Sequence, residues 1–261
     1  MNHFIAIEVS EDGDKYLMVH CGSRNLGLQV ANYYQRLGIE ARDSRIENAK
    51  KGRDEAIRYL AQCGFYSMIE GVKDAYKFFL ANEPSDDLCY IEEEMLEDYL
   101  HDVDIMRQWS YLNHKTIAEE ICTHMGWDIK SQITSIHNYV DVSNRIIRKG
   151  AIAAYVGQYC LIPFNMAEGT LVCVGKGNED YLCSAPHGAG RIMPRAQARK
   201  DVDMEEYEKS MEGIYSSCVC SSTIDESPQA YKASTVIIDA IKETVDIVDH
   251  LRPIYNFKAK D

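Results

Sequence analysis

The sequence lacks the segments that direct a protein to membranes or to the cell exterior. No apolar run reaches 18 residues, so no transmembrane helix is expected. The first residues, Met1-Asn-His-Phe, have neither the basic region nor the long apolar stretch of a signal peptide. The nine cysteines are odd in number and follow no disulfide framework, which predicts reduced thiols. These absences predict a cytoplasmic protein with no membrane partner.

Motifs of several common enzyme classes are also absent. There is no Cys-x-x-Cys zinc pair, no Walker phosphate loop and no Gly-x-Ser-x-Gly esterase motif. Gly175-Lys-Gly-Asn has no third glycine, so the dinucleotide-binding pattern fails as well. Cys183 precedes His187 by four residues, but no third group that would orient a thiol nucleophile is evident. The chemistry must therefore be sought in other residue patterns.

Charge is distributed unevenly along the chain. The net charge of −13 argues against a protein that coats nucleic acids in general. Residues 82–104 carry ten acidic side chains and no Lys or Arg, a pattern typical of the solvated face of a helix. Residues 141–200 instead carry eight basic side chains against four acidic ones. An anionic substrate in this second region remains compatible with the sequence.

Hydrophobic spacing predicts a helical segment inserted between short strands. Runs at 3–9 and 15–20 flank Asp12-Gly13 and predict an antiparallel hairpin, which brings His3 and His20 within a residue or two of each other. Helices are expected from about Leu26 to Ala81 and from Ile91 to Met125. The glycines expected to divide the first of these regions are Gly38, Gly52, Gly64 and Gly71.

The second half of the chain reads as short strands followed by one helix. Strands are predicted at 133–140, 144–148, 151–155, 169–174 and 213–219. The apolar stripe in Thr235–His250 predicts a helix that ends at Arg252-Pro253. The whole indicates a single α+β domain, residues 1–261, with a mixed, largely antiparallel sheet and a helical insertion at about 26–125.

The stretch Cys183-Ser-Ala-Pro-His-Gly-Ala-Gly-Arg191 is the strongest local signal. Strands are expected at 172–174 and 181–183, and a basic helix is expected to open at Arg191 with Pro194 in its first turn. Glycines at such a junction let backbone N–H groups approach an anion, and a histidine there can act as ligand, base or nucleophile. A helix start that carries an ordinary surface histidine is an equally open interpretation.

Four of the eight histidines lie beside small polar residues in turns and strands. They are His3, His20, His137 and His187. Three imidazoles from separate elements can form a metal site, although sequence spacing does not show that these converge. The other four lie in helical stretches or at their ends and are interpreted as surface or packed residues.

An ordered set of short blocks resembles the RtcB family of RNA-splicing ligases. The blocks follow the family order over essentially the whole chain: Asn2-His3-Phe4, His20-Cys-Gly-Ser-Arg24, His137-Asn138, Arg148-Lys-Gly-Ala151, Gly157-Gln158, Gly175-Lys-Gly-Asn178, His187-Gly-Ala-Gly-Arg191, Met193, Arg195, Ala230-Tyr-Lys232, Leu251-Arg252 and Lys258. Each block is weak by itself, whereas the ordered set is specific.

The resemblance implies an RNA ligase that depends on GTP and Mn²⁺. Such an enzyme joins RNA 2′,3′-cyclic phosphate or 3′-phosphate ends to 5′-hydroxyl ends through a histidine-guanylate, with His187 as the nucleophile. His3, His20 and His137 match the metal-binding histidines of the family. The expected GTP contacts are Asn2, His137, Asn138, Thr170, His187, Gly188, Ala189, Gly190, Tyr231 and Lys258. The arginines expected to hold RNA phosphates are Arg24, Arg191 and Arg195.

Several positions depart from the family pattern. The resemblance implies an N-terminal section, ahead of the Asn-His motif, with an Asp and a Cys that complete the metal site. We expect full activity to need that section, as a separate polypeptide or in a longer reading frame. Phe164-Asn-Met-Ala167 replaces a Gly-Ser-Met-Gly loop, and Ala6 stands where a guanine-contacting glutamate is usual, with Glu8 on the same strand face. Pro186 and Pro194 replace serines.

Three hypotheses therefore remain open from the sequence. The first is an RNA ligase of this family. The second is a descendant or fragment that binds RNA ends or nucleotide without ligating them. The third is an interaction protein built on the long acidic helices. Incorporation of guanylate, salt-dependent RNA binding without guanylate, and a protein partner at residues 82–125 are the respective distinguishing observations.

Overall fold

The computed structural model describes residues 3–258, and the chain divides into two compact units. One unit is formed by Met1–Gly22 and Arg107–Asp261, and the other by Ser23–Met106. Helices and sheets are both abundant in it, and the expected α+β fold class is confirmed. The single-domain organisation with an insertion at about 26–125 stays a prediction.

The predicted N-terminal hairpin is confirmed. Strands β1 (Phe4–Val9) and β2 (Lys15–His20) are antiparallel, with Phe4 opposite His20. This register places His3 one residue from the partner of His20, as the sequence predicts. The rings of Phe4 and His20 stack with their centroids 5.0 Å apart.

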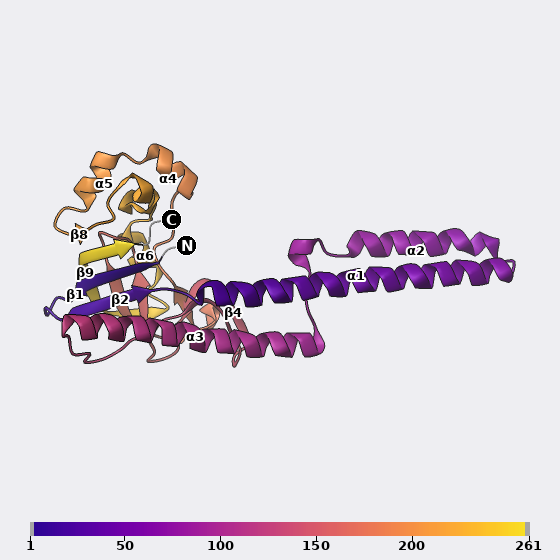
Figure 1. Ribbon diagram of the computed structural model, residues 1–261, viewed down its shortest axis with the longest axis horizontal. Helices are drawn as coiled ribbons and strands as arrows, with labels where there is room; N and C mark the ends of the chain where they lie inside the picture. Colours follow the sequence, from indigo (N-terminus) through magenta and orange to yellow (C-terminus); the bar gives the residue numbers. More distant parts are fainter. Residues whose placement is uncertain (1–2, 259–261) are drawn as a thin grey trace. The chain divides into compact units, whose positions relative to one another are not determined.

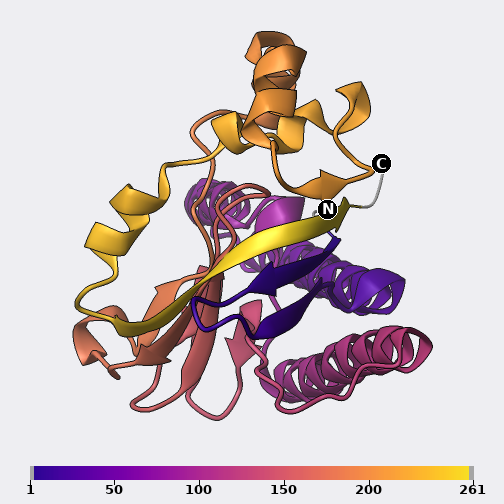
Figure 2. The same cartoon turned by 90° about the vertical axis from the view of Figure 1, so that its left-hand side faces the viewer.

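The larger sheet has the strand order β2-β1-β9-β6-β5, with β8 paired to β9. Its remaining strands are β5 (Tyr159–Pro163), β6 (Thr170–Gly175), β8 (Tyr215–Ser216) and β9 (Val245–Lys258). The long strand β9 runs antiparallel to β1 and to β6 and so joins the two ends of the sheet (Figure 2). Only the short β8 pairs in parallel.

The helix expected over Thr235–His250 is wrong in its second half. Helix α6 spans Ser234–Ala240, and the chain then turns into β9. Ile237, Ile241 and Val245 are buried as the apolar stripe predicts, whereas Val248, the fourth member of the stripe, is exposed. The apolar stripe was compatible with a helix or a strand. The β-branched residues of β9 form a strand because they pair with two neighbouring strands. Proline interrupts a strand ladder least at a bulge, and Pro253 lies opposite Glu8 where the β1–β9 register shifts.

A second sheet carries the strands that lead to His137 and His187. It has the order β3-β4-β7, with β3 (His137–Asp141), β4 (Ile146–Ala153) and β7 (Ser184–Pro186). The two strands predicted at 144–148 and 151–155 are therefore one. Strand β5 was missed, and the strand expected over 213–219 is reduced to the two residues of β8.

Helices make up the other unit. Helix α1 (Arg24–Gln62) and α2 (Ile69–Asn82) lie side by side and are joined by the 3₁₀ turn Tyr66–Met68 (Figure 1). The expected division at Gly38, Gly52 and Gly71 is wrong, because all three lie inside helices, and the break falls at Gly64. Gly38 has a packing role, since an added Cβ would lie 3.3 Å from the Tyr90 carbonyl oxygen.

Helix α3 (Glu93–Met125) confirms the helix predicted over Ile91–Met125. Its acidic first turns are exposed, as expected of a solvated face. Its residues up to Met106 belong to the helical unit and the rest to the sheet unit. Within residues 3–258, no helix is both long and apolar enough to cross a membrane.

The main core of the sheet unit lies between strands β4, β5 and β6 and helix α6. Its largest buried members include Ile152, Ile162, Leu171 and Ile241. Ala189, two residues after His187, belongs to the same core. Apolar packing of Ala189 therefore holds the loop that carries His187 against the main core. A smaller core forms around Met166 and Tyr207.

Candidate functional site

Three of the predicted site histidines converge in the sheet unit. His20 ends β2, His137 begins β3 and His187 follows β7. The Nε2 atoms of His20 and His137 are 3.5 Å apart, and the ring centroids of His137 and His187 are 4.7 Å apart. We call these three residues the histidine cluster. Sequence spacing left open whether these histidines converge, and the tertiary structure brings them together.

The histidine cluster favours neutral imidazoles. Burial, together with a smaller contribution from the neighbouring His137, His114, His3 and His187, lowers the pKa of His20 to about 4. Burial, followed by the nearby His187, also lowers the pKa of His137. A neutral imidazole presents one nitrogen lone pair, which a metal ion or an electrophile can use. His3 directly precedes Phe4, the residue opposite His20 in the β1–β2 ladder.

The ring of His187 is held by the backbone of strand β4. Its Nδ1 lies 2.8 Å from the carbonyl oxygen of Gly150. A carbonyl oxygen only accepts hydrogen bonds, so in the neutral ring Nδ1 carries the proton and Nε2 keeps its lone pair. Gly188 allows the chain to pass closely here, because an added Cβ would lie 2.8 Å from the Pro163 carbonyl oxygen.

The strand-to-helix junction expected at His187 is wrong. The segment 181–183 forms a turn in which Leu182 and Cys183 have left-handed backbones, so no strand forms there. Helix α4 begins at Arg195, with Pro194 as its N-cap, and has only seven residues. The residues between His187 and Pro194 form a loop. His187 is therefore not placed at a helix N-terminus, and a helix dipole does not act on it.

The end of β2 is fixed by helix α3. The Asn113 amide donates a hydrogen bond to the Cys21 sulfur at 3.2 Å, and His114 Nε2 lies 2.7 Å from the Cys21 carbonyl oxygen. These contacts hold the residue next to His20. They agree with the interpretation of His114 as a packed residue, and they give it a role in placing the histidine cluster.

A second buried polar group contains paired charges. Lys258 Nζ lies 2.9 Å from Glu226 Oε2, and the Tyr231 hydroxyl donates to the same oxygen at 2.6 Å. Arg195 pairs with Asp225 at 2.6 Å and also contacts Glu226. We call these five residues the charged cluster. Asp225 and Glu226 were missed by sequence reasoning, because no motif marks the acidic residues that oppose Arg195 and Lys258.

The acids of the charged cluster stay ionised despite their burial. Burial alone would raise the pKa of Glu226, but the Lys258 ammonium and the Tyr231 hydroxyl hold it below its usual value. Hydrogen bonds from Arg195 and Arg199 similarly outweigh burial at Asp225. These charged and hydrogen-bonding partners therefore stabilise the ionised carboxylates in place of water.

The arginines predicted to hold RNA phosphates have protein partners of their own. Arg191 donates to the Asp225 carbonyl oxygen at 2.6 Å, and its guanidinium lies 5.1 Å from the centroid of the Tyr231 ring. Arg195 belongs to the charged cluster. Their phosphate contacts stay a prediction. Arg24 opens α1 in the other unit, and Asn2 lies outside the described residues.

Thr170 contacts a buried carboxyl rather than an open surface. Its hydroxyl donates to Glu8 Oε1 at 3.1 Å, and both side chains are buried. Burial raises the pKa of Glu8 to about 7, although the Thr170 hydrogen bond opposes this shift. Glu8 is thus an acid whose protonation changes near neutral pH, on the strand face that the sequence indicated.

The histidine cluster does not by itself satisfy the requirements of a manganese site. Over residues 3–258, no three His, Cys, Asp or Glu side chains are grouped closely enough to hold a metal ion. The cluster offers nitrogen donors, whereas Mn²⁺ favours carboxylate, carbonyl and water oxygens. An oxygen donor from elsewhere, such as a substrate phosphate, is needed to complete the coordination.

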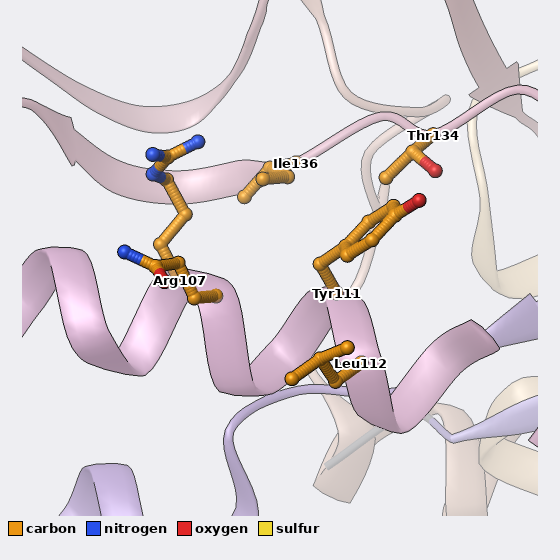
Figure 3. A pocket seen from close by; sticks show the side chains of 6 residues that line it. Arg107, Tyr111, Leu112, Thr134 and Ile136 are labelled. Carbon is orange, nitrogen blue, oxygen red and sulfur yellow. The ribbon is translucent and has the colours of Figure 1, made fainter. Parts of the chain in front are cut away.

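An open cavity of about 400 Å³ lies between α3 and the segment that precedes β3. Arg107, Tyr111, Leu112, Thr134 and Ile136 line it together with Gln108 (Figure 3). None of the predicted site residues lines it. Ile136 immediately precedes His137, so the cavity adjoins the site along the chain without forming part of it.

Comparison with known proteins agrees with the order of these residues. The family model described as tRNA-splicing ligase RtcB matches residues 2–259. The chain is 28% identical to the RNA-splicing ligase RtcB of Escherichia coli K12 over 97% of this chain and 58% of that relative. It is 25% identical to the tRNA-splicing ligase RtcB of Archaeoglobus fulgidus over 94% of this chain and 52% of that relative.

The chain thus spans just over half the length of these curated relatives. The match nevertheless extends from the strand hairpin before His20 to the end of β9, and so includes all three histidines of the cluster. A family model that covers nearly every described residue establishes kinship beyond any single motif. The chain belongs to the RtcB family.

Proposed function

We propose that this chain is the catalytic portion of a GTP- and Mn²⁺-dependent RNA ligase. It joins RNA 2′,3′-cyclic phosphate or 3′-phosphate ends to 5′-hydroxyl ends through a guanylate carried on His187. The names of its relatives, RNA-splicing and tRNA-splicing ligases, support the class of reaction. The observation that carries the proposal is the hydrogen bond from His187 Nδ1 to the Gly150 carbonyl oxygen, which leaves Nε2 nucleophilic.

Nε2 of His187 forms a bond to the α-phosphorus of GTP as the bond to the β-phosphate oxygen breaks. Pyrophosphate leaves with the electrons of that bond. A 2′,3′-cyclic phosphate end is first hydrolysed by water to a 3′-phosphate with a free 2′-hydroxyl. An oxygen of the RNA 3′-phosphate then attacks the guanylate phosphorus, the phosphorus–nitrogen bond breaks, and the His187 imidazole is regenerated. The 5′-hydroxyl of the second RNA end then attacks this activated phosphate and releases GMP.

The histidine cluster supports this role through its charge state. Lowered pKa values keep His20 and His137 neutral at neutral pH, so protons do not compete with the metal ion for their ring nitrogens. His3, His20 and His137 are not grouped closely enough to hold a metal ion by themselves. We propose that these three histidines would ligate Mn²⁺ only together with oxygen donors from a substrate or from outside residues 3–258. When bound, Mn²⁺ offsets phosphate charge. The chain's own residues orient the nucleophile.

The charged cluster supports nucleotide binding beside the nucleophile. The backbone of Tyr231 forms an isolated antiparallel β-bridge with Arg191, which lies four residues after His187. The Tyr231 hydroxyl donates a hydrogen bond to Glu226. We propose that Tyr231 and Lys258 contact the guanine, and that Arg191 and Arg195 face RNA or nucleotide phosphates. Arginine is suited to such contacts because its donors form a planar fork.

Guanylylation tests the proposal directly. The chain is incubated with α-³²P-labelled GTP and Mn²⁺, both alone and with the N-terminal section of a longer family member added. We expect a covalent, acid-labile label that His187→Ala abolishes. His124→Ala is the matched control, because His124 is exposed near the end of α3 and should leave labelling unchanged. Absence of label under both conditions would refute the proposal.

A second candidate function follows from the incomplete donor set. The histidine cluster lacks a carboxylate or thiolate, so a protein that binds RNA ends or nucleotide without ligating them is the alternative. Salt-dependent RNA binding that His187→Ala leaves unchanged, with no guanylylation, favours this alternative.

A further inference from the structure

The peptide backbone of Gly150 connects the side chains of Asn138 and His187. The Gly150 N–H donates to Asn138 Oδ1 at 2.6 Å, and the Gly150 carbonyl oxygen accepts from His187 Nδ1 at 2.8 Å. The same carbonyl oxygen lies 3.4 Å from the backbone nitrogen of His187. One residue of β4 thus holds both the ring and the backbone of His187, and one side chain holds that residue.

Local backbone geometry brings Asn138 to this position. The register of β3 and β4 shifts between His137 and Tyr139, and Asn138 is the residue at that irregularity. Its φ is +54°, a left-handed conformation that asparagine adopts more readily than most residues. Irregularities of this kind redirect a side chain away from the regular ladder. Here the redirected amide oxygen meets the Gly150 N–H.

Gly150 transmits the position of Asn138 to the ring of His187. Its own φ is +68°, and an added Cβ would lie 3.7 Å from Cε1 of the His187 ring. The ring therefore packs directly against this residue. The Gly150 N–H and carbonyl belong to the two peptide units that share the Gly150 Cα. A displacement of Gly150 would therefore move the carbonyl oxygen that fixes Nδ1–H, and either tautomer of the ring would then be accessible.

We propose that Asn138 is a positioning residue that acts on His187 through the backbone of Gly150. Its Oδ1 holds the Gly150 N–H and so the position of Gly150, and the Gly150 carbonyl oxygen in turn fixes the tautomer and the direction of Nε2. The proposal rests on the proposed function, in which His187 is the nucleophile. It differs from the GTP contact that family resemblance implies for Asn138, because positioning uses Oδ1 whereas a contact to phosphate would use the amide nitrogen.

Two substitutions separate these roles. Asn138→Gly removes the acceptor but tolerates the left-handed backbone. Asn138→Asp keeps an acceptor oxygen in the same place, also tolerates that backbone and removes the amide donor. Asn138 is exposed and lies in no core, so both variants should fold, and their circular dichroism and thermal unfolding verify this.

The primary measurement is the tautomer of His187. Histidine is labelled with ¹⁵N, the His187 resonances are assigned by their loss in His187→Gln, and spectra are recorded at pH 8. We expect the wild type and Asn138→Asp to show a protonated Nδ1 and an unprotonated Nε2. Asn138→Gly should show averaged nitrogen shifts. A wild-type spectrum in Asn138→Gly would overturn the proposal.

Single-turnover guanylylation gives the second measurement. Misplacement of a reacting group commonly costs about tenfold to a hundredfold in rate, and we expect a loss of this size in Asn138→Gly at saturating GTP. Asn138→Asp should recover most of that loss. If it is as slow as Asn138→Gly while its tautomer is normal, the amide donor matters instead and the positioning role is refuted. If the wild type is not guanylylated, the proposed function fails, whereas the tautomer comparison still decides the role of Asn138.

Discussion

The histidine cluster and the charged cluster both lie in the sheet unit and are both at least partly buried, but they differ in how their charges are balanced. In the charged cluster every acid faces a cation, as Glu226 faces Lys258 at 2.9 Å and Asp225 faces Arg195 at 2.6 Å. The histidine cluster instead brings three imidazole side chains together, and burial keeps the rings of His20 and His137 neutral.

This difference separates a self-sufficient arrangement from one that needs a ligand. Paired buried charges stabilise one another, and removing one partner leaves the other charge buried and unpaired, which costs several kcal/mol of stability. Neutral imidazoles placed together offer nitrogen lone pairs to an external cation or electrophile. We therefore associate the histidine cluster with the chemical step, and the charged cluster with stability in addition to the nucleotide contacts proposed for Tyr231 and Lys258.

The largest expected effect concerns Glu226. Glu226→Gln keeps the shape of the side chain but leaves Lys258 buried without its counter-charge. We expect the free energy of unfolding, measured by urea denaturation, to fall by about 3–5 kcal/mol. The double variant with Lys258→Met removes both charges and should recover much of that loss. A loss below about 1 kcal/mol in the single variant, typical of exposed pairs, would break the comparison.

An intermediate effect is expected in the pH dependence of stability. The pKa of His20 is about 4 in the folded chain against an ordinary value of 6.5, so the unfolded state binds more protons between these values. The free energy of unfolding should therefore decrease as the pH falls from about 6.5 to about 4, by up to about 3 kcal/mol from this residue.

His20→Phe isolates this contribution. Phenylalanine preserves an aromatic ring against Phe4 but does not titrate. Denaturation at a series of pH values should show a smaller acid loss in this variant than in the wild type. The exposed His124→Phe should keep the wild-type pH dependence. Equal acid losses in His20→Phe and the wild type would contradict a buried, neutral His20.

The smallest effect is expected at the rim of the charged cluster. Arg199 lies 3.3 Å from Asp225, but its side chain is 53% exposed. Solvent screens such a pair, so Arg199→Ala should lower the free energy of unfolding by less than about 1 kcal/mol. Added salt should reduce even this difference. A loss as large as that of Glu226→Gln would show that the stabilising charges extend to the surface of the cluster.

Sequence patterning predicted the elements whose neighbours in space are also neighbours in sequence. Asp12-Gly13 between two apolar runs was sufficient for the β1–β2 hairpin, and the spacing over Ile91–Met125 was sufficient for α3. The same reasoning failed for Val245–His250, because the β1 and β6 partners that make it a strand come from distant parts of the chain. Gly38 and Gly52 likewise failed to break α1, since a single glycine costs a helix only about 1 kcal/mol relative to alanine, which the rest of a long helix tolerates.

The sequence by itself determined the family, the α+β class and the identity of the candidate histidines, because these depend on residue order and local periodicity. Only the tertiary structure brought His20, His137 and His187 together and paired Glu226 with Lys258. It also set the tautomer of His187 through a backbone carbonyl 37 residues away in the chain. Proximity across strands depends on register and burial, which no local pattern specifies.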